Sequence, residues 1–336
     1  MSLFIQHTSG ITPLNRQPEP LYHRAADPSY AVLGEPAQTR RMCRHSKMGL
    51  YTAMECLNTL EHREVDGIIW GTGIASFESA GRFLKELVSN NEALANPAVF
   101  VQSSHNTISG QLAQLIQCKG YNSTYYNGGF SFENVLMDAL LHTMENEEQQ
   151  FLIGASDEMF PLYYDWLKDG GIAGHTGYLP GEGAAAFLVS GKPGSTPLCK
   201  VDQVLQLYNP GDGPWLQEEL NNFLERSGCD INDIDLLLLG TSADQEKDTL
   251  LQPLADRMPA ALPRIPFKKY CGEYYTATAF ALWLAVQVLQ NGQYPESITE
   301  VNNPPQEVKR ILVASQWQGR YYSFILVSDP FIHPND

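Results

Sequence analysis

The sequence alternates short apolar runs with stretches of helical periodicity, and the alternation repeats along its 336 residues. The clearest apolar runs end in glycine, at residues 67–73 and 235–240. Extended or strand-like segments are expected at 3–6, 98–102, 122–126, 150–154, 184–189, 198–206, 264–267, 310–315 and 321–327. Helices are expected at 47–62, 77–88, 107–118, 131–144, 215–226, 247–257 and 274–289. Strands that alternate with helices predict an α/β protein, in which helices cover mostly parallel sheets.

The order of the elements is similar in the two halves of the chain, which indicates an internal duplication. Segment 191–197 is rich in Gly, Pro and Ser and is the expected junction. Residues 1–190 and 198–336 are therefore predicted to form two related halves. Near the end of the second half, Gln318-Gly319 predicts a tight hairpin between two antiparallel strands.

Composition excludes several classes of protein. Asp and Glu outnumber Lys and Arg by 38 to 22, and this charge of −16 disfavours nucleic-acid binding. No apolar run reaches the ~20 residues of a membrane span, and the first residues lack the charged region of a signal peptide. The six cysteines are scattered and the eight histidines lack ligand spacing, so we expect reduced thiols, a cytoplasmic location, no metal and no cofactor.

The most specific segment is Gly181-Glu182-Gly183, which precedes the apolar run 184–189. Considered alone, it predicts a tight turn. The glycines would supply positive φ angles, and the glutamate could accept hydrogen bonds from backbone N–H groups.

In context, this segment resembles the Gly-Glu-Gly-Ala motif of the β-ketoacyl synthases, which belong to the thiolase superfamily. Other segments resemble landmarks of that family in the same order, at 97–110, 152–158, 235–241 and 268–273. The resemblance implies a thiolase-like fold, in which two duplicated βαβαβ halves form α-β-α-β-α layers. It also implies a dimer whose seam uses the strand at 122–126.

The family's chemistry needs a cysteine thiolate at a helix N-terminus and two histidines that polarise a thioester carbonyl. The resemblance places the nucleophile position at Gly129 and the histidine positions at Leu239 and Glu273. Lys268 alone keeps its residue type in the last motif. Since hydrogen, isobutyl and carboxylate groups cannot perform these roles at neutral pH, no intact catalytic set is expected.

Other residues could replace the missing groups. Ser131 lies two residues after the nucleophile position, where a helix cap is the expected role, and Cys271 is either a displaced nucleophile or an inert buried thiol. His105 and His175 could line the pocket or the dimer seam, although structural roles are expected. Lys268 and Glu273 could form an ion pair in the vacated site. Aromatic residues surround both altered positions, either as core packing or as a wall shaped around an acyl chain; they are Tyr121, Tyr125, Tyr126, Phe130, Phe132, Tyr270, Tyr274 and Tyr275.

The leading hypothesis is a catalytically incomplete ketosynthase homologue that resembles chain-length factors, most of all the ketosynthase-like proteins of aryl-polyene clusters. Such a chain would pair with an active ketosynthase in fatty-acid or polyketide biosynthesis, and an acyl carrier protein would dock on that partner. One alternative is an active acyltransferase or condensing enzyme that uses Cys271 or Ser131. Another is a homodimeric module that binds acyl chains or carrier proteins.

Overall fold

The computed structural model describes residues 2–14, 21–34, 39–40, 42–58, 60, 64–93, 96–171, 177–292, 294–298 and 307–332. The strands of this part of the chain form one continuous sheet of ten, in the order β3-β2-β4-β5-β1-β6-β10-β9-β7-β8. The first half contributes β1 (Leu3–Ile11), β2 (Gly67–Gly71), β3 (Tyr121–Tyr125), β4 (Gln150–Asp157) and β5 (Gly183–Ser190). The second half contributes β6 (Cys199–Tyr208), β7 (Leu236–Gly240), β8 (Arg264–Pro266), β9 (Arg310–Trp317) and β10 (Tyr321–Ser328).

The two halves share one topology, which confirms the predicted duplication. In each half the strands lie in the order third, second, fourth, fifth, first. The second strand is parallel to the third and fourth, and the fifth is antiparallel to the fourth and first. The halves join where β1 and β6 run antiparallel around the pair Phe4–Lys200. The junction falls between β5 and β6, and we propose residues 1–190 and 198–336 as the two structural units.

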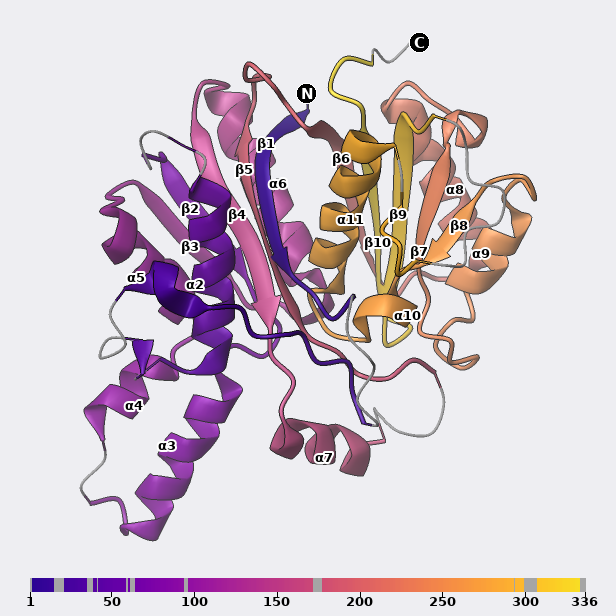
Figure 1. The fold of residues 1–336 in the computed structure, drawn as a ribbon. Coiled ribbons are helices and arrows are strands. Elements are labelled where there is room, and N and C mark those ends of the chain that lie inside the picture. Colours follow the sequence, from indigo (N-terminus) through magenta and orange to yellow (C-terminus); the bar gives the residue numbers. More distant parts are fainter. Residues whose placement is uncertain are drawn as a thin grey trace.

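The sheet separates the helices into layers (Figure 1). Helices α2 (Arg44–Leu57) and α5 (Thr107–Ile116) cover the outer face of the first half. Helices α8 (Gly213–Arg226) and α9 (Leu251–Arg257) cover the outer face of the second half. The central layer consists of α6 (Ser131–Glu145) and α11 (Ala277–Asn291), which pack against the inner faces of both halves.

The four leucines of β7 pack alternately against the helices on the two faces of the sheet. Leu236 and Leu238 belong to the central core, whereas Leu237 and Leu239 pack into the outer core with α8 and α9. A strand that is buried on both faces reads as a continuous apolar run, because successive side chains point to opposite faces. The α-β-α-β-α layering expected from the family resemblance is therefore present.

The expected extended segment at 98–102 was wrong. This segment belongs to α4 (Pro97–Gln102), because the Asn96 side chain accepts a hydrogen bond from Ala98 N at 3.0 Å and Pro97 occupies the first turn. Figure 1 shows that α4 and α3 (Phe77–Ser89) project from the body of the molecule. Two further helices were not predicted, namely α7 (Pro161–Asp169) and the short α10 (Lys268–Cys271).

Helices α3, α5 and α6 begin at the predicted residues, whereas other predicted helices differ from the structure at their ends. The helix expected at 47–62 is α2, which begins three residues earlier, at Arg44, and already ends at Leu57. Helix α9 begins at Leu251 rather than at 247, and α11 begins at Ala277 rather than at 274. The hairpin between β9 and β10 is confirmed, with positive φ angles of 53° at Gln318 and 62° at Gly319. None of the helices described is long and apolar enough to cross a membrane.

Candidate functional site

Two segments that are distant in the sequence meet at a pair of glycines. Gly181 N donates a hydrogen bond to Glu273 O at 3.0 Å, and Glu273 N donates to Leu179 O at 2.9 Å. A Cβ atom on Gly181 would lie 2.0 Å from Cys271 O, and one on Gly272 would lie 2.5 Å from Gly181 Cα. Both positions therefore need glycine, because the two backbones are in direct contact.

The expected positive φ angles at Gly181 and Gly183 were wrong, since neither residue lies in that region. Gly183 needs to be small for another reason, because a Cβ atom there would lie 2.6 Å from the Tyr274 hydroxyl oxygen. The predicted role of Glu182 is confirmed. Its fully buried carboxylate accepts hydrogen bonds from Ala25 N at 2.8 Å and Met159 N at 2.9 Å.

The Glu182 carboxylate is also paired with a cation. Arg44 donates to both of its oxygens at 2.8 Å, from Nη1 and from Nη2. This two-bond geometry gives a strong, directional ion pair. The central residue of the motif thus fixes the start of α2 and the backbone around Ala25 and Met159, which is a structural role.

The space beside Gly129 is filled. Gly129 lies in the short helix η2 (Gly128–Phe130), which leads into α6. A Cβ atom there would lie 2.8 Å from Trp317 Cβ and 3.0 Å from Tyr321 Cβ. The Tyr275 ring packs against the Trp317 ring, with 4.5 Å between the ring centres. The chamber that remains has a volume of about 10 Å³, which is room for about one water molecule.

The chamber is lined by aromatic, hydroxyl and amide groups and by one lysine. Its walls are Gly129, Lys268, Tyr274, Tyr275, Ala277, Thr278, Ser315, Gln316, Trp317, Tyr321 and Ser323. None of these described lining residues carries a thiol or an imidazole. The arrangement offers hydrogen bonds and one positive charge, and no ready nucleophile.

Lys268 and Glu273 form the expected ion pair. Lys268 is 1% exposed, and its Nζ lies 2.8 Å from Glu273 Oε1. The same ammonium group donates to the Gln316 backbone oxygen and lies 5.9 Å from the centre of the Trp317 ring. Burial raises the pKa of Glu273, and the Lys268 charge opposes this effect. The lysine that the motif retains is thus neutralised within the protein.

Leu239, the other position compared with a catalytic histidine, does not face the chamber. Its side chain packs with α8 and α9 in the outer core. Side chains alternate between the two faces of a strand, so the next residue, Gly240, is the one that faces inward. It carries no side chain, and a Cβ atom there would lie 2.5 Å from Ser315 Oγ. The structure therefore brings Gly129 and Lys268 together at the chamber and leaves Leu239 outside it.

Glu133 is the polar residue of this region that sequence reasoning missed. It lies on α6 and is fully buried, with Oε1 accepting a hydrogen bond from Ser323 Oγ at 2.8 Å. Its Oε2 atom and the Thr278 hydroxyl have no hydrogen-bond partner among the described residues. Burial raises the pKa of Glu133 to about 7, and the hydrogen bond from Ser323 and the charge of Lys268 oppose this shift only in part.

The alternative nucleophiles have structural surroundings. Ser131 is fully buried, and its hydroxyl donates to Gly128 O and accepts from Asn127 N, both at 2.9 Å. Cys271 is also fully buried, and burial raises the pKa of its thiol well above the ordinary value. His105 is exposed, and its ring packs in a tilted arrangement against the exposed ring of Tyr126, with 4.1 Å between the ring centres. His175 lies outside the described residues.

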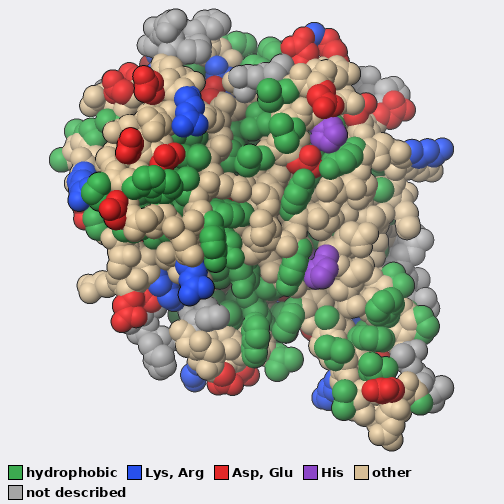
Figure 2. All heavy atoms as spheres, turned by 180° about the vertical axis from the view of Figure 1, so that it is seen from behind, with side chains coloured by type: hydrophobic (Ala, Val, Ile, Leu, Met, Phe, Trp, Pro, Cys, Tyr) green, Lys and Arg blue, Asp and Glu red, His purple; other side chains and the backbone are tan. Residues whose placement is uncertain are grey.

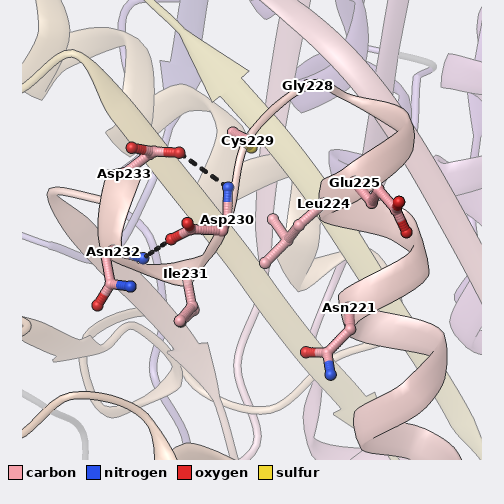
Figure 3. Close-up of a pocket in the computed structure, with 9 residues that line it drawn as sticks. All are labelled: Asn221, Leu224, Glu225, Gly228, Cys229, Asp230, Ile231, Asn232 and Asp233. Carbon is pink, nitrogen blue, oxygen red and sulfur yellow. Dashed lines mark hydrogen bonds between the residues drawn. The ribbon is translucent and has the colours of Figure 1, made fainter.

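A larger hollow, of about 660 Å³, lies between the end of α8 and the short helix η3 (Ile231–Asp233) (Figure 3). The side chains of its two aspartates already accept hydrogen bonds from backbone N–H groups. Asp230 accepts one from Asn232 N at 2.6 Å, and Asp233 accepts one from Asp230 N at 2.8 Å. None of its lining residues reaches the chamber. In the described part of the chain, no group of three or more His, Cys, Asp or Glu side chains is arranged to hold a metal ion.

Comparison with solved structures shows the fold. A β-ketoacyl synthase from Burkholderia phymatum STM815 superposes with a TM-score of 0.79 at 13% identity, over 98% of this chain and 99% of the other. The ishigamide ketosynthase/chain length factor gives a TM-score of 0.77 at 11% identity, with 98% and 99% covered. A type II polyketide ketosynthase in complex with its acyl-carrier protein gives 0.73 at 16% identity, again with 98% and 99% covered.

The sequence comparisons give the family. No curated protein sequence matches this chain. The family profile described as the N-terminal domain of β-ketoacyl synthase matches residues 15–209, which is more than half of the chain. Together with the duplicated topology and the paired glycines, this match shows that the chain belongs to the β-ketoacyl synthase family, within the thiolase superfamily.

Proposed function

We propose that this chain is a β-ketoacyl synthase homologue that does not condense acyl chains by itself. It would act as a non-condensing partner, or as a subunit that shapes the growing acyl chain, in fatty-acid or polyketide biosynthesis of the aryl-polyene type. The observation that carries the proposal is the filled space at Gly129, where Trp317 and Tyr321 leave a chamber of about 10 Å³.

The chemistry of the chamber supports this proposal. Condensation requires a thiolate to accept the acyl group and donors that stabilise the developing oxyanion. Lys268, the cation among the described residues that line the chamber with Gly129, is held by Glu273 and by the Gln316 backbone. Cys271 and Ser131 are fully buried, so neither presents an accessible nucleophile to a thioester.

The open edge of the sheet supports a dimer. Strand β3 is the outermost strand of the first half, and Tyr121 and Asn122 are exposed on it. Its sequence is symmetric in type about Ser123, with Asn122 and Thr124 next and tyrosines at both ends. An antiparallel partner strand would continue the sheet across a two-fold axis. The partner is either an active ketosynthase or a second copy, and we place the assembly in the cytoplasm.

Intact-mass spectrometry after incubation with acyl and malonyl thioesters tests the loss of condensing activity. We expect no covalent adduct on the chain and no release of CO₂. An active ketosynthase that becomes acylated under the same conditions is the positive control. An adduct that is lost in Cys271→Ala or in Ser131→Ala would contradict the proposal and identify a displaced nucleophile.

Size-exclusion chromatography with light scattering tests the dimer. The chain is measured alone and after co-expression with ketosynthases encoded beside it. Ser123→Lys would place two lysines opposite each other in a two-fold homodimer and only one in a heterodimer. It should therefore dissociate a homodimer more strongly. Asn221→Lys, on the exposed side of α8, is the control. A monomer under all pairings would contradict the proposal.

A further inference from the structure

One face of the central helix α6 remains uncovered. Met137, Leu141 and Met144 lie along one stripe of the helix and are 41%, 61% and 60% exposed. Figure 2, which shows the molecule from behind, shows apolar side chains gathered down the middle of that side of the molecule. Exposed large apolar groups on a helix that is otherwise buried in the central layer mark a surface that binds something.

This stripe is the floor of a trough of about 370 Å³ between α6, β6 and the end of α8. A volume of this size is typical of sites for small molecules. Leu140 and Val204 add to the apolar surface, and the rim is polar. We call this hollow the α6 trough.

Two charged residues, Asp202 and Arg226, line the rim, and they differ in whether another described residue balances their charge. Asp202 accepts hydrogen bonds from Ser2 and Ser328 and lies 3.6 Å from Lys200 Nζ. The carboxylate at the rim is thus already neutralised and hydrogen-bonded. Arg226, in the last turn of α8, is exposed and has no ion-pair partner among the residues that the structure describes.

We propose that the α6 trough binds a small amphipathic carboxylate. The apolar chain or ring of the ligand lies along Met137, Leu141 and Met144, and its carboxylate receives two hydrogen bonds from the Arg226 guanidinium. Arginine favours this planar, two-bond recognition of carboxylates. Methionine side chains suit ligands of variable shape, because the thioether is flexible and polarisable. This proposal is independent of whether the chamber at Gly129 is active.

Methyl NMR of the full chain, labelled at the methionine methyl groups, tests the proposal with sodium octanoate as the probe. The signals of Met137 and Met144 should shift and saturate, whereas that of Met48, which is fully buried under the first half, should not move. The neutral 1-octanol and the cationic octylammonium should bind at least about tenfold more weakly, because they lack the charge-assisted hydrogen bonds.

Two matched variants test the role of the guanidinium. Arg226→Met should weaken octanoate binding by about tenfold or more, since it keeps an apolar side chain and removes the charge. Arg257→Met, at the exposed end of α9 and outside the trough, should leave binding unchanged. Circular dichroism of both variants should match that of the parent chain.

Several results would overturn the proposal. Equal affinity for octanoate and 1-octanol, or full affinity in Arg226→Met, would show that no carboxylate is recognised. Shifts of Met48 equal to those of Met137 would indicate non-specific detergent-like binding. Shifts of Met137 and Met144 that follow protein concentration without ligand would assign the trough to a second copy of the chain.

Discussion

Glu133 is a fully buried carboxylate, and replacing it by glutamine should make the protein more stable at alkaline pH. The side chain is fully buried, and one of its oxygens has no hydrogen-bond partner among the described residues. Burial raises its pKa from 4.5 to about 7. Glutamine has nearly the same shape, keeps the acceptor for Ser323 and carries no charge.

The sign and size of the effect follow from proton linkage. Between pH 4.5 and 7, the folded protein holds the Glu133 proton more tightly than the unfolded chain does, so stability falls as pH rises through this window. Above pH 7, ionised Glu133 costs about 3 kcal/mol of unfolding free energy relative to a group with an ordinary pKa. We expect Glu133→Gln to match the parent near pH 4.5 and to exceed it by about 3 kcal/mol at pH 9.

Urea unfolding at pH 4.5, 6, 7.5 and 9 measures this difference. Subtracting the parent from the variant removes the contribution of other buried acids that titrate in the same range, such as Glu158. Glu145→Gln, at the exposed end of the same helix, is the control and should show no such trend. A difference between Glu133→Gln and the parent that is constant across pH would refute the reasoning.

Three further predictions concern the same region. Gly129→Cys should lower the melting temperature by the equivalent of about 1–3 kcal/mol, since its Cβ meets the indole beside it, and should not decarboxylate malonyl thioesters; measurable CO₂ release would count against the filled chamber. Gly183→Val should destabilise the protein by more than about 3 kcal/mol, because even a Cβ atom there would lie 2.6 Å from a tyrosine hydroxyl, and an unchanged melting temperature would disprove this. Lys268→Met should cost about 3–5 kcal/mol in urea unfolding by leaving Glu273 buried without its cation, and adding Glu273→Gln should restore most of the loss; no recovery in the double variant would contradict the pairing.

Much of the fold could be predicted, because its signals are local. In the run 235–240, Asp235 is followed only by leucines and a glycine. Such a run predicts a strand that is buried on both faces of the sheet. The repeat of that alternation predicted two related halves, and the identical strand order confirms it. The segment 98–102 was assigned wrongly because Asn96 and Pro97, which start a helix, lie just before it.

The candidate site could be predicted only in part. The ion pair of Lys268 and Glu273 was expected because the family resemblance places both residues in one short motif beside the altered site. The filling of the chamber by Trp317 and Tyr321 depends on a hairpin nearly 190 residues after Gly129, and no local pattern reports such a contact. The resemblance of segment 235–241 to a family landmark also gave no information about which face of the strand the Leu239 side chain would occupy.

Glu133 was missed for a physical reason. An acidic residue in the first turn of a helix is favourable at the surface, because it interacts with the helix dipole. The sequence is therefore typical of a solvated helix N-terminus, although α6 lies between two layers of sheet and Ser131, Phe132 and Glu133 are all buried. The one clue was the apolar character of its neighbours Phe132 and Val135, which are both fully buried.

The position of β1 in the sheet has a consequence for the order in which the protein assembles during synthesis. β1 is translated before the other strands described, yet it is hydrogen-bonded between β5 and β6, with Phe4 opposite both Ser190 and Lys200. Its first partner, β5, follows β1 only after roughly 170 further residues, and its second, β6, comes later still. The emerging chain must therefore carry an apolar segment unpaired through most of the translation of the first half, and closure of the molecule waits for a strand that belongs to the second.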